Sequence, residues 1–183
     1  PTDSRAWRAT WRRLGPLPLY YPRAVATTAR ETRAGRYDVV VECLNKVPFY
    51  SPLYSRAPVL ALCHHLFGEV AFRQVPWPVA AVVWGSERLI PAVYARRPFL
   101  AISESSRDDL VRRGIAAEQV FVSHPGIDRP RTPVQVESPR GRHVAYVGRL
   151  EVYKKVDLLL AAMARLAARF PDARITIIGR GPA

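Results

Sequence analysis

The sequence has few of the residues that form covalent cross-links. Of its 183 residues only two are cysteine, Cys43 and Cys63, and both end apolar runs. We predict that they are buried, reduced thiols, as in a protein of a reducing compartment. A disulfide, or a zinc site with His64 and His65, is the alternative, although the spacings match no common metal module. A disulfide scaffold is therefore not expected.

A long hydrophobic run is also missing. A helix needs about 20 apolar residues to cross a bilayer, and the longest such segment, residues 79–94, is broken by Ser86, Glu87 and Arg88. The first residues contain no apolar core followed by a cleavage site for secretion. These absences predict a cytoplasmic protein. We interpret Pro1, which stands where an initiator methionine would be, as the mark of a fragment.

Acidic residues are scarce. There are 15 Asp and Glu against 28 Lys and Arg, which gives a formal net charge of +13. The excess is strong in residues 1–36, where eight arginines face only Asp3 and Glu31. Such a charge favours anionic partners, namely nucleotide phosphates, acidic lipid surfaces or nucleic acid.

Residues 5–14 read as a helix with two distinct sides. At helical spacing the apolar and cationic residues separate as follows: Trp7, Trp11 and Leu14 on one side, and Arg5, Arg8 and Arg12 on another. This pattern is typical of a helix on an anionic membrane surface, with tryptophan at headgroup level. Peripheral attachment to the inner face of the cell membrane is one interpretation of this pattern. A helix packed on a sheet, with solvated arginines, is the other and the more usual one.

From residue 37 onward, short β-branched runs alternate with helical patterns. The predicted strands are residues 37–43, 59–63, 99–103, 120–123, 143–147 and 174–178. The predicted helices are residues 21–34, 77–95, 104–113 and 154–170, and Gly35 and Gly114 stand where helix C-caps belong. Most strands are almost continuously apolar, which is typical of burial on both faces. The pattern predicts an α/β protein with doubly wound parallel sheets.

A proline-rich segment interrupts this alternation. Residues 129–141 have no hydrophobic periodicity and are predicted to be an interdomain linker. Residues 1–128 would form a first Rossmann-like domain that is incomplete at its start. Residues 142–183 would form the first β-α-β unit of a second domain, which we expect to be truncated because about 40 residues cannot close a doubly wound sheet.

The turn after the strand at 143–147 carries the clearest chemical signal. Gly148 and Arg149 follow the strand, and Lys154 precedes a helix. A guanidinium, an ammonium and free N–H groups at a helix start together suit a phosphate group. A basic loop without a ligand is the alternative interpretation of the spacing alone.

Residues 144–182 resemble the start of the second domain in retaining glycosyltransferases of family 4. In that family a Gly-Arg-Leu turn and a lysine five residues after the arginine hold the diphosphate of a sugar nucleotide. The resemblance therefore implies donor-diphosphate binding by Gly148, Arg149 and Lys154, and places Gly179, Arg180 and Gly181 in a loop of the donor cleft. It implies the GT-B fold of two Rossmann-like domains. Lys155 stands where many members have glycine, which matters only if the backbone there is left-handed.

Two histidines follow another predicted strand. His64 and His65 stand at its carboxyl end, where open α/β sheets bind ligands. From the residues alone, a hydrogen-bonded structural histidine is the preferred interpretation. Residues 58–64 resemble the family strand that ends in a histidine facing the donor sugar. The resemblance thus implies a catalytic position for His64 and makes His65 an acceptor-side candidate.

A polar loop follows the first predicted strand. Glu42, Asn45 and Lys46 are candidates for contacting the acceptor, and the loop is similar to one in a subset of family 4. A general base at Glu42 is not needed, because transfer in this family is described as front-face attack in which the leaving phosphate takes the acceptor proton. We predict a solvated or salt-bridged Glu42. Ser103 is predicted to cap the helix at 104–113.

The resemblance implies a retaining hexosyltransferase that uses a nucleotide-sugar donor. The acceptor would be a lipid-linked glycan or a polysaccharide precursor. No cofactor is expected, and no metal, since the cations can replace one and the sequence lacks an Asp-x-Asp motif. The family's Glu-x7-Glu pair would lie beyond Ala183, so the fragment alone is expected to be inactive. The alternative is a basic, non-enzymatic nucleic-acid-binding module, although no recognised module of that kind is present.

Overall fold

The computed structural model describes residues 10, 12–127 and 141–182. The chain divides into two compact units, residues 1–127 and 128–183, each of which is described by itself. Most of the predicted linker, residues 129–140, lies outside the described residues, and so do Trp7, Trp11 and most of the predicted helix at 5–14.

Four parallel strands form the sheet of the first unit. They are β1 (Val40–Leu44), β2 (Val59–Cys63), β3 (Phe99–Ala101) and β4 (Val120–Val122), in the spatial order β1-β2-β3-β4. Successive strands step across the sheet in one direction. Because crossovers between parallel strands are right-handed, they all fall on the same face. This is the parallel arrangement of a Rossmann-like α/β domain.

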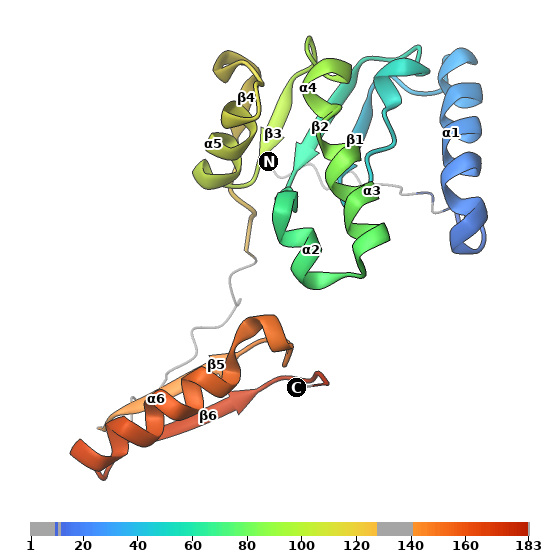
Figure 1. The fold of residues 1–183 in the computed structure, drawn as a ribbon. Helices are drawn as coiled ribbons and strands as arrows, with labels where there is room; N and C mark the ends of the chain where they lie inside the picture. Colours follow the sequence, from blue (N-terminus) through green and yellow to red (C-terminus); the bar gives the residue numbers. More distant parts are fainter. Residues whose placement is uncertain (1–9, 11, 128–140, 183) are drawn as a thin grey trace, which may run out of the picture. The chain divides into compact units, whose positions relative to one another are not determined.

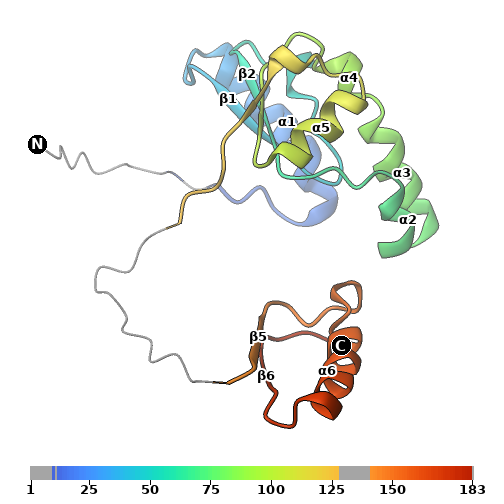
Figure 2. The same ribbon diagram turned by 90° about the vertical axis from the view of Figure 1, so that its left-hand side faces the viewer.

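The helices that join these strands lie on one side of the sheet, as Figures 1 and 2 show. The longer ones are α3 (Trp77–Glu87) and α5 (Glu104–Arg112), and α1 (Leu17–Arg33) packs beside the edge strand β1. Short helices complete the unit: η1 (Ser51–Leu53), η2 (Gly68–Val70), α2 (Ala71–Gln74), α4 (Ile90–Val93) and η3 (Ala117–Gln119). No helix of the described residues combines the length and apolar character that a membrane crossing requires.

The core lies between the sheet and these helices. Val59, Ala61 and Cys63 of β2 are buried, whereas the alternate residues Leu60 and Leu62 are only half-buried. The same alternation runs through β1, where Val41 and Cys43 are exposed, and reaches Phe121 of β4. The prediction of strands buried on both faces is therefore wrong for the described residues, because no described helix covers the second face.

Both cysteines are free, as predicted, but only Cys63 is buried. Cys43 lies on the exposed face of β1, so the prediction of burial is wrong for it. The apolar run around it could not reveal which face would be covered. Burial raises the pKa of Cys63 to about 12.

The helix boundaries follow local signals. Gly35 and Gly114 have φ values of +64° and +100° directly after α1 and α5, so both predicted C-caps are confirmed. The N–H of Arg36 donates to Glu31 O, and that of Ile115 to Leu110 O, as in a Schellman motif. The helix predicted at 77–95 is instead two helices. Pro91 has no N–H to donate to the carbonyl four residues earlier, so a continuous helix cannot form there.

The second unit contains two parallel strands and one long helix. β5 (His143–Val147) pairs with β6 (Arg174–Ile178), and between them come η4 (Val152–Lys154) and α6 (Val156–Arg169). Met163, 8% exposed, is the one buried core residue among the described residues of this unit. An ion pair between Arg142 and Asp172, at 3.1 Å, links the residues that precede the two strands.

Candidate functional site

In the first unit, the candidate residues follow the carboxyl ends of neighbouring strands. The register pairs Leu44 of β1 with Cys63 of β2, so the loops that begin at Asn45 and His64 leave the sheet side by side. The side chains of Asn45, Lys46, His64 and His65 are all exposed. Both loops thus present polar groups at the edge where open α/β sheets bind ligands.

A buried glutamate holds the histidine loop. Glu87, 1% exposed, lies at the end of α3 and accepts the N–H of Phe67 and the N–H of Gly68, each at 2.7 Å. Arg113 lies 3.4 Å from the same carboxylate and balances its charge. Removing Glu87 would leave two backbone N–H groups without an acceptor, and removing Arg113 would leave the buried carboxylate without a counter-charge. Both changes are costly, so the conformation of the histidine loop is strongly determined.

Gly68 is favoured in this arrangement. Its φ is +53°, and a Cβ there would lie 2.8 Å from the Nη2 atom of Arg113. The other side of the loop is fixed by Ser106, whose hydroxyl donates to the carbonyl oxygen of His64 at 2.6 Å. The backbone around His64 is therefore held from both α3 and α5.

Glu42 serves the neighbouring loop in the same way. It is 5% exposed, and its two carboxylate oxygens accept four hydrogen bonds. The donors are the Phe49 N–H (2.7 Å), the Ser51 N–H (3.0 Å), the Ser51 hydroxyl (2.5 Å) and the Tyr94 hydroxyl (2.7 Å). The prediction of a solvated or salt-bridged Glu42 is wrong: the side chain is buried, and none of the ion pairs among described residues involves it.

Tyr94 couples this carboxylate to the core. Its hydroxyl donates to Glu42 and accepts the N–H of Tyr50 at 3.1 Å. Burial, followed by the negative charge of Glu42, raises the pKa of Tyr94 well above its ordinary value. The tyrosine therefore remains a neutral donor over the whole physiological range.

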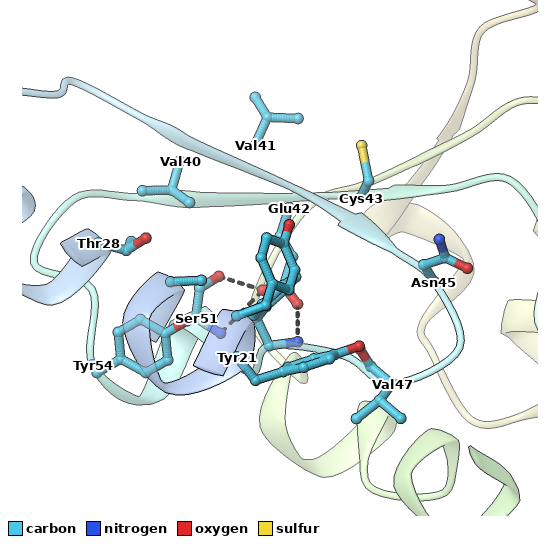
Figure 3. Close-up of a pocket in the computed structure, with 13 residues that line it drawn as sticks. Tyr21, Thr28, Val40, Val41, Glu42, Cys43, Asn45, Val47, Ser51 and Tyr54 are labelled. Atoms are coloured by element: carbon cyan, nitrogen blue, oxygen red, sulfur yellow. Dashed lines mark hydrogen bonds between the residues drawn. The ribbon is translucent and has the colours of Figure 1, made fainter. Parts of the chain in front are cut away.

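A cavity of about 410 Å³ lies between α1 and β1. Figure 3 shows Glu42 on the same side of β1 as Tyr21, Ser51 and Tyr54, while Val41 and Cys43 point to the other side. The Tyr21 ring stacks on Phe49 with centroids 4.7 Å apart. Since both oxygens of Glu42 already accept hydrogen bonds, its role is to order the loop that carries Asn45 and Lys46.

Ser103 caps α5, as the sequence predicted. Its hydroxyl oxygen accepts the N–H of Ser106 at 3.2 Å. This cap fixes the start of α5 at the same edge of the sheet as the histidine loop, because Ser106 also contacts the His64 carbonyl.

In the second unit, the two predicted donor loops lie against each other. The N–H of Gly148 donates to Ile178 O at 3.0 Å, and that of Leu150 donates to Arg180 O at 2.9 Å. The parallel pairing of β5 and β6 thereby continues past both strands. A Cβ at Gly179 would lie 1.8 Å from the Gly148 carbonyl oxygen, so only glycine permits this approach.

Gly181 is subject to the same constraint. A Cβ there would lie 1.8 Å from the carbonyl oxygen of Leu150. The Tyr146 hydroxyl also donates to the Arg149 carbonyl at 3.0 Å. The turn that carries Arg149 is thus fixed by backbone contacts on one side and by Tyr146 on the other.

The two predicted phosphate-binding cations are exposed. Arg149 forms an ion pair with Glu151, and the hydrogen bond within this pair raises the pKa of the guanidinium. The ammonium of Lys154 lies 5.4 Å from the centroid of the Tyr153 ring. No side chain caps α6, so its first N–H groups remain open beside these cations.

Lys155, which stands where many family members have glycine, adopts a left-handed backbone conformation. Its φ is +55° and its ψ is +42°, and it is the residue directly before α6. A left-handed backbone costs an L-residue other than glycine, asparagine or aspartate about 1 kcal/mol. The structure therefore stores strain where family members have glycine.

Sequence reasoning missed the residues that order the two loops of the first unit: Glu87, Tyr94, Ser106 and Arg113. One signal was available for Glu87. It ends a run of 13 uncharged residues that begins after Arg73, and a charge on such an apolar helix indicates a buried, bonded group. Within the described residues, no three His, Cys, Asp or Glu side chains are close enough together to hold a metal ion.

Comparison with known proteins identifies the family. The sequence model of glycosyltransferase family 4 matches residues 3–131, which is more than half of the chain. The chain belongs to glycosyltransferase family 4. The search of curated protein sequences gave no match for this family 4 chain.

Two solved structures resemble the family 4 chain. One is the lipopolysaccharide outer core galactosyltransferase WaaB in its apo form, with a TM-score of 0.52 and 18% identity over 90% of this chain. The other is a mutant of S. aureus TarM in complex with fondaparinux, alpha-GlcNAc-glycerol and UDP, with a TM-score of 0.49 and 16% identity over 70% of this chain. The chain spans 43% of the WaaB chain and 24% of the TarM chain. The likeness to WaaB supports the predicted GT-B fold.

Proposed function

We propose that the protein is a retaining glycosyltransferase that uses a nucleotide-sugar donor, and that the second unit binds the donor diphosphate. The observation that carries this proposal is the close pairing of residues 148–150 with residues 178–181 beside the uncapped start of α6. The guanidinium of Arg149, the ammonium of Lys154 and the first N–H groups of α6 follow this pairing within a few residues along the chain. Those are the groups that bind a diphosphate.

The chemistry proposed for this edge is electrostatic. As the glycosidic bond to phosphate breaks, negative charge develops on the diphosphate, and Arg149 and Lys154 would stabilise it. Arg149 would exchange its ion pair with Glu151 for phosphate oxygens, a change that suits its planar fork. Two fixed cations can do what a divalent metal does elsewhere, so we propose transfer without a metal or a cofactor.

The first unit would hold the acceptor and the sugar. His64 is proposed to contact the donor sugar, and Asn45, Lys46 and His65 are proposed to contact the acceptor. Glu87 and Glu42 would contact neither substrate. They would fix the two loops that carry these residues, because they accept backbone N–H groups of those loops. The acceptor hydroxyl would give its proton to the leaving phosphate, so no carboxylate base is needed. Glu42, whose oxygens are already bonded, is not available as one.

The proposed acceptor is a lipid-linked glycan or a polysaccharide precursor. The excess of cations in the chain favours a protein that works beside anionic lipid, at the cytoplasmic face of a membrane. Binding measured with a panel of nucleotide sugars defines the donor sugar and its base.

The experiment that tests the diphosphate site is an NMR titration of the chain with UDP, GDP, ADP and inorganic pyrophosphate. We expect amide shifts at Gly148, Arg149 and the first turn of α6, and a loss of at least about tenfold in affinity when Arg149→Ala and Lys154→Ala are combined. The matched control is Arg165→Ala, an exposed cation on α6 away from its start. Equal affinity of the double variant and the control would refute the assignment.

A further inference from the structure

One helix of the first unit presents an apolar face to solvent. On α3, Ala80, Val83 and Glu87 are buried at helical spacing against the domain. The opposite side carries Val82, 61% exposed, and Leu89 follows at the end of the helix. A helix that is apolar on all sides is normally covered on all sides, and no described residue covers this one.

The neighbouring segments enlarge this face. The docking face is defined here by its exposed apolar side chains: Val70, Phe72, Trp77, Val79, Val82 and Leu89. Trp77, at 70%, is the most exposed of them. The Phe72 ring contacts Trp84 at 6.4 Å between centroids, which joins α2 to α3. Exposed apolar side chains gathered on neighbouring elements in this way mark an interaction surface.

The charges around the docking face are two exposed arginines, Arg73 and Arg88, and one exposed carboxylate, Glu69, next to Val70. No charged residue occurs between Arg73 and Glu87, and Glu87 is buried and bonded. Arg73 and Arg88 are exposed at the two ends, and the guanidinium of Arg88 lies 4.5 Å from the centroid of the Trp84 ring. Exposed apolar side chains, an exposed tryptophan and flanking arginines match the composition of surfaces that insert into the headgroup region of a bilayer.

We propose that this docking face binds an anionic lipid bilayer, lying in the plane of the headgroups. At 11 residues α3 is too short to cross a membrane, so contact at the surface is the geometry that fits. A second copy of the chain is a poorer occupant, because facing copies would oppose their arginines and each chain carries a net charge of +13. An anionic surface meets both the apolar side chains and the cations.

The position of the docking face gives this contact a purpose. Figure 1 shows α2 and the start of α3 extending past the carboxyl end of β2, from which the loop with His64 and His65 leaves. A lipid-linked acceptor held in the bilayer would then meet the loops of the first unit. This purpose rests on the proposed function, whereas the contact with lipid does not depend on it.

The test uses the whole chain and needs neither donor nor acceptor. Binding is measured by flotation with vesicles of phosphatidylcholine alone and of phosphatidylcholine mixed with phosphatidylglycerol. We expect binding to the mixed vesicles only, and a loss of about tenfold or more in the combined variant Trp77→Ala and Val82→Ser. The control is Leu53→Ser, an equally exposed apolar residue on η1, which should bind like the unchanged chain. Arg73→Gln should weaken binding, and Arg165→Gln should do so less.

A site-specific probe separates this face from other basic segments of the chain. An environment-sensitive fluorophore is attached at Val82→Cys in a Cys43→Ser background, where the remaining thiol, Cys63, is buried. We expect a blue shift with the mixed vesicles, and none from a probe at Leu53→Cys. Membrane binding without a shift at position 82 would place the contact elsewhere and overturn the proposal. The proposal would also be overturned if the chain did not bind the mixed vesicles. A dimer in sedimentation experiments that Val82→Ser dissociates would overturn it as well. Unchanged UDP binding when Arg149→Ala and Lys154→Ala are combined, with vesicle binding intact, would refute the proposed function and leave the contact with lipid standing.

Discussion

At the scale of single residues, strain and charge are concentrated at a few positions. The left-handed Lys155 is the clearest case, because its φ of +55° is one that glycine adopts without cost. The sequence showed that this position departs from the family. Only the backbone conformation shows that a residue other than glycine costs free energy at this position.

Replacing Lys155 by glycine should stabilise the second unit. Relief of the left-handed strain is partly offset by the greater flexibility of glycine in the unfolded chain, so the expected gain is about 0.5–1 kcal/mol. Hydrogen exchange of the β5 and β6 amides measures it. The matched control is Lys154→Gly, at an ordinary backbone position, which should destabilise the same amides. A loss of protection in both variants would contradict the strain at Lys155.

Glu31 is the residue from which acid sensitivity is expected. It is buried beside Arg12, Arg30 and Arg36. Burial alone would raise the pKa of this carboxyl, but the hydrogen bonds and charges of the three arginines outweigh it, so the net pKa lies below the ordinary 4.5. A lowered pKa means that the folded chain binds the proton less well than the unfolded chain.

The stability contributed by Glu31 is therefore present above about pH 4.5 and lost as the pH falls through the lower folded-state pKa. We expect the free energy of unfolding to fall less steeply with acid in Glu31→Gln than in the unchanged chain. Denaturant unfolding at a series of pH values between neutral and pH 3 measures this slope. Glu118→Gln, an exposed carboxylate on η3, serves as the control and should leave the slope unchanged. Parallel slopes for Glu31→Gln and the unchanged chain would contradict the argument.

At the scale of elements, the sequence predicted the regular structure well and the ordering of loops poorly. The bounds of β2, β5 and β6 agree with those predicted, since each is a short apolar run between clear turn signals. Pro91 divides the helix predicted at 77–95, a break that its missing N–H makes understandable. Contacts between elements far apart in sequence, such as Glu87 with the loop after β2, depend on topology and leave no periodic signal.

The contact between Glu87 and the histidine loop predicts a large effect of a small change. In Glu87→Gln an amide replaces a carboxylate that accepts two backbone N–H groups, and its NH2 group then faces a donor. The expected loss is about 2–4 kcal/mol of the free energy of unfolding. Urea unfolding followed by tryptophan fluorescence of the first unit measures it. Glu69→Gln, exposed in the neighbouring turn, should change it by less than about 0.5 kcal/mol.

At the scale of the whole molecule, the two units differ in how much apolar surface they bury. The first unit contains a continuous core in which Leu44, Phe99 and Leu110 are almost fully buried. In the described part of the second unit Met163, 8% exposed, is the one buried apolar residue. Length predicted part of this imbalance, since residues 142–183 are too few to close a doubly wound sheet. Composition did not predict it, because the strands of both units are similarly apolar in sequence. The structure adds which faces are covered, and therefore which side chains are buried.

Because hydrophobic burial is the main stabilising term, the second unit should open at a lower free energy than the first. Hydrogen exchange of the unchanged chain, read by mass spectrometry, should show slow exchange for the amides of β2 and β3 and much faster exchange for β5 and β6. β2 and β3 pair with a strand on each side, whereas β5 and β6 pair only with each other, so the comparison is restricted to amides that donate a hydrogen bond across a strand pair in each sheet. Met163→Ala should increase exchange in β5 and β6 and leave β2 and β3 unchanged, whereas Leu110→Ala should do the reverse. Equal protection of the two sheets would mean that burial within each unit does not determine its stability.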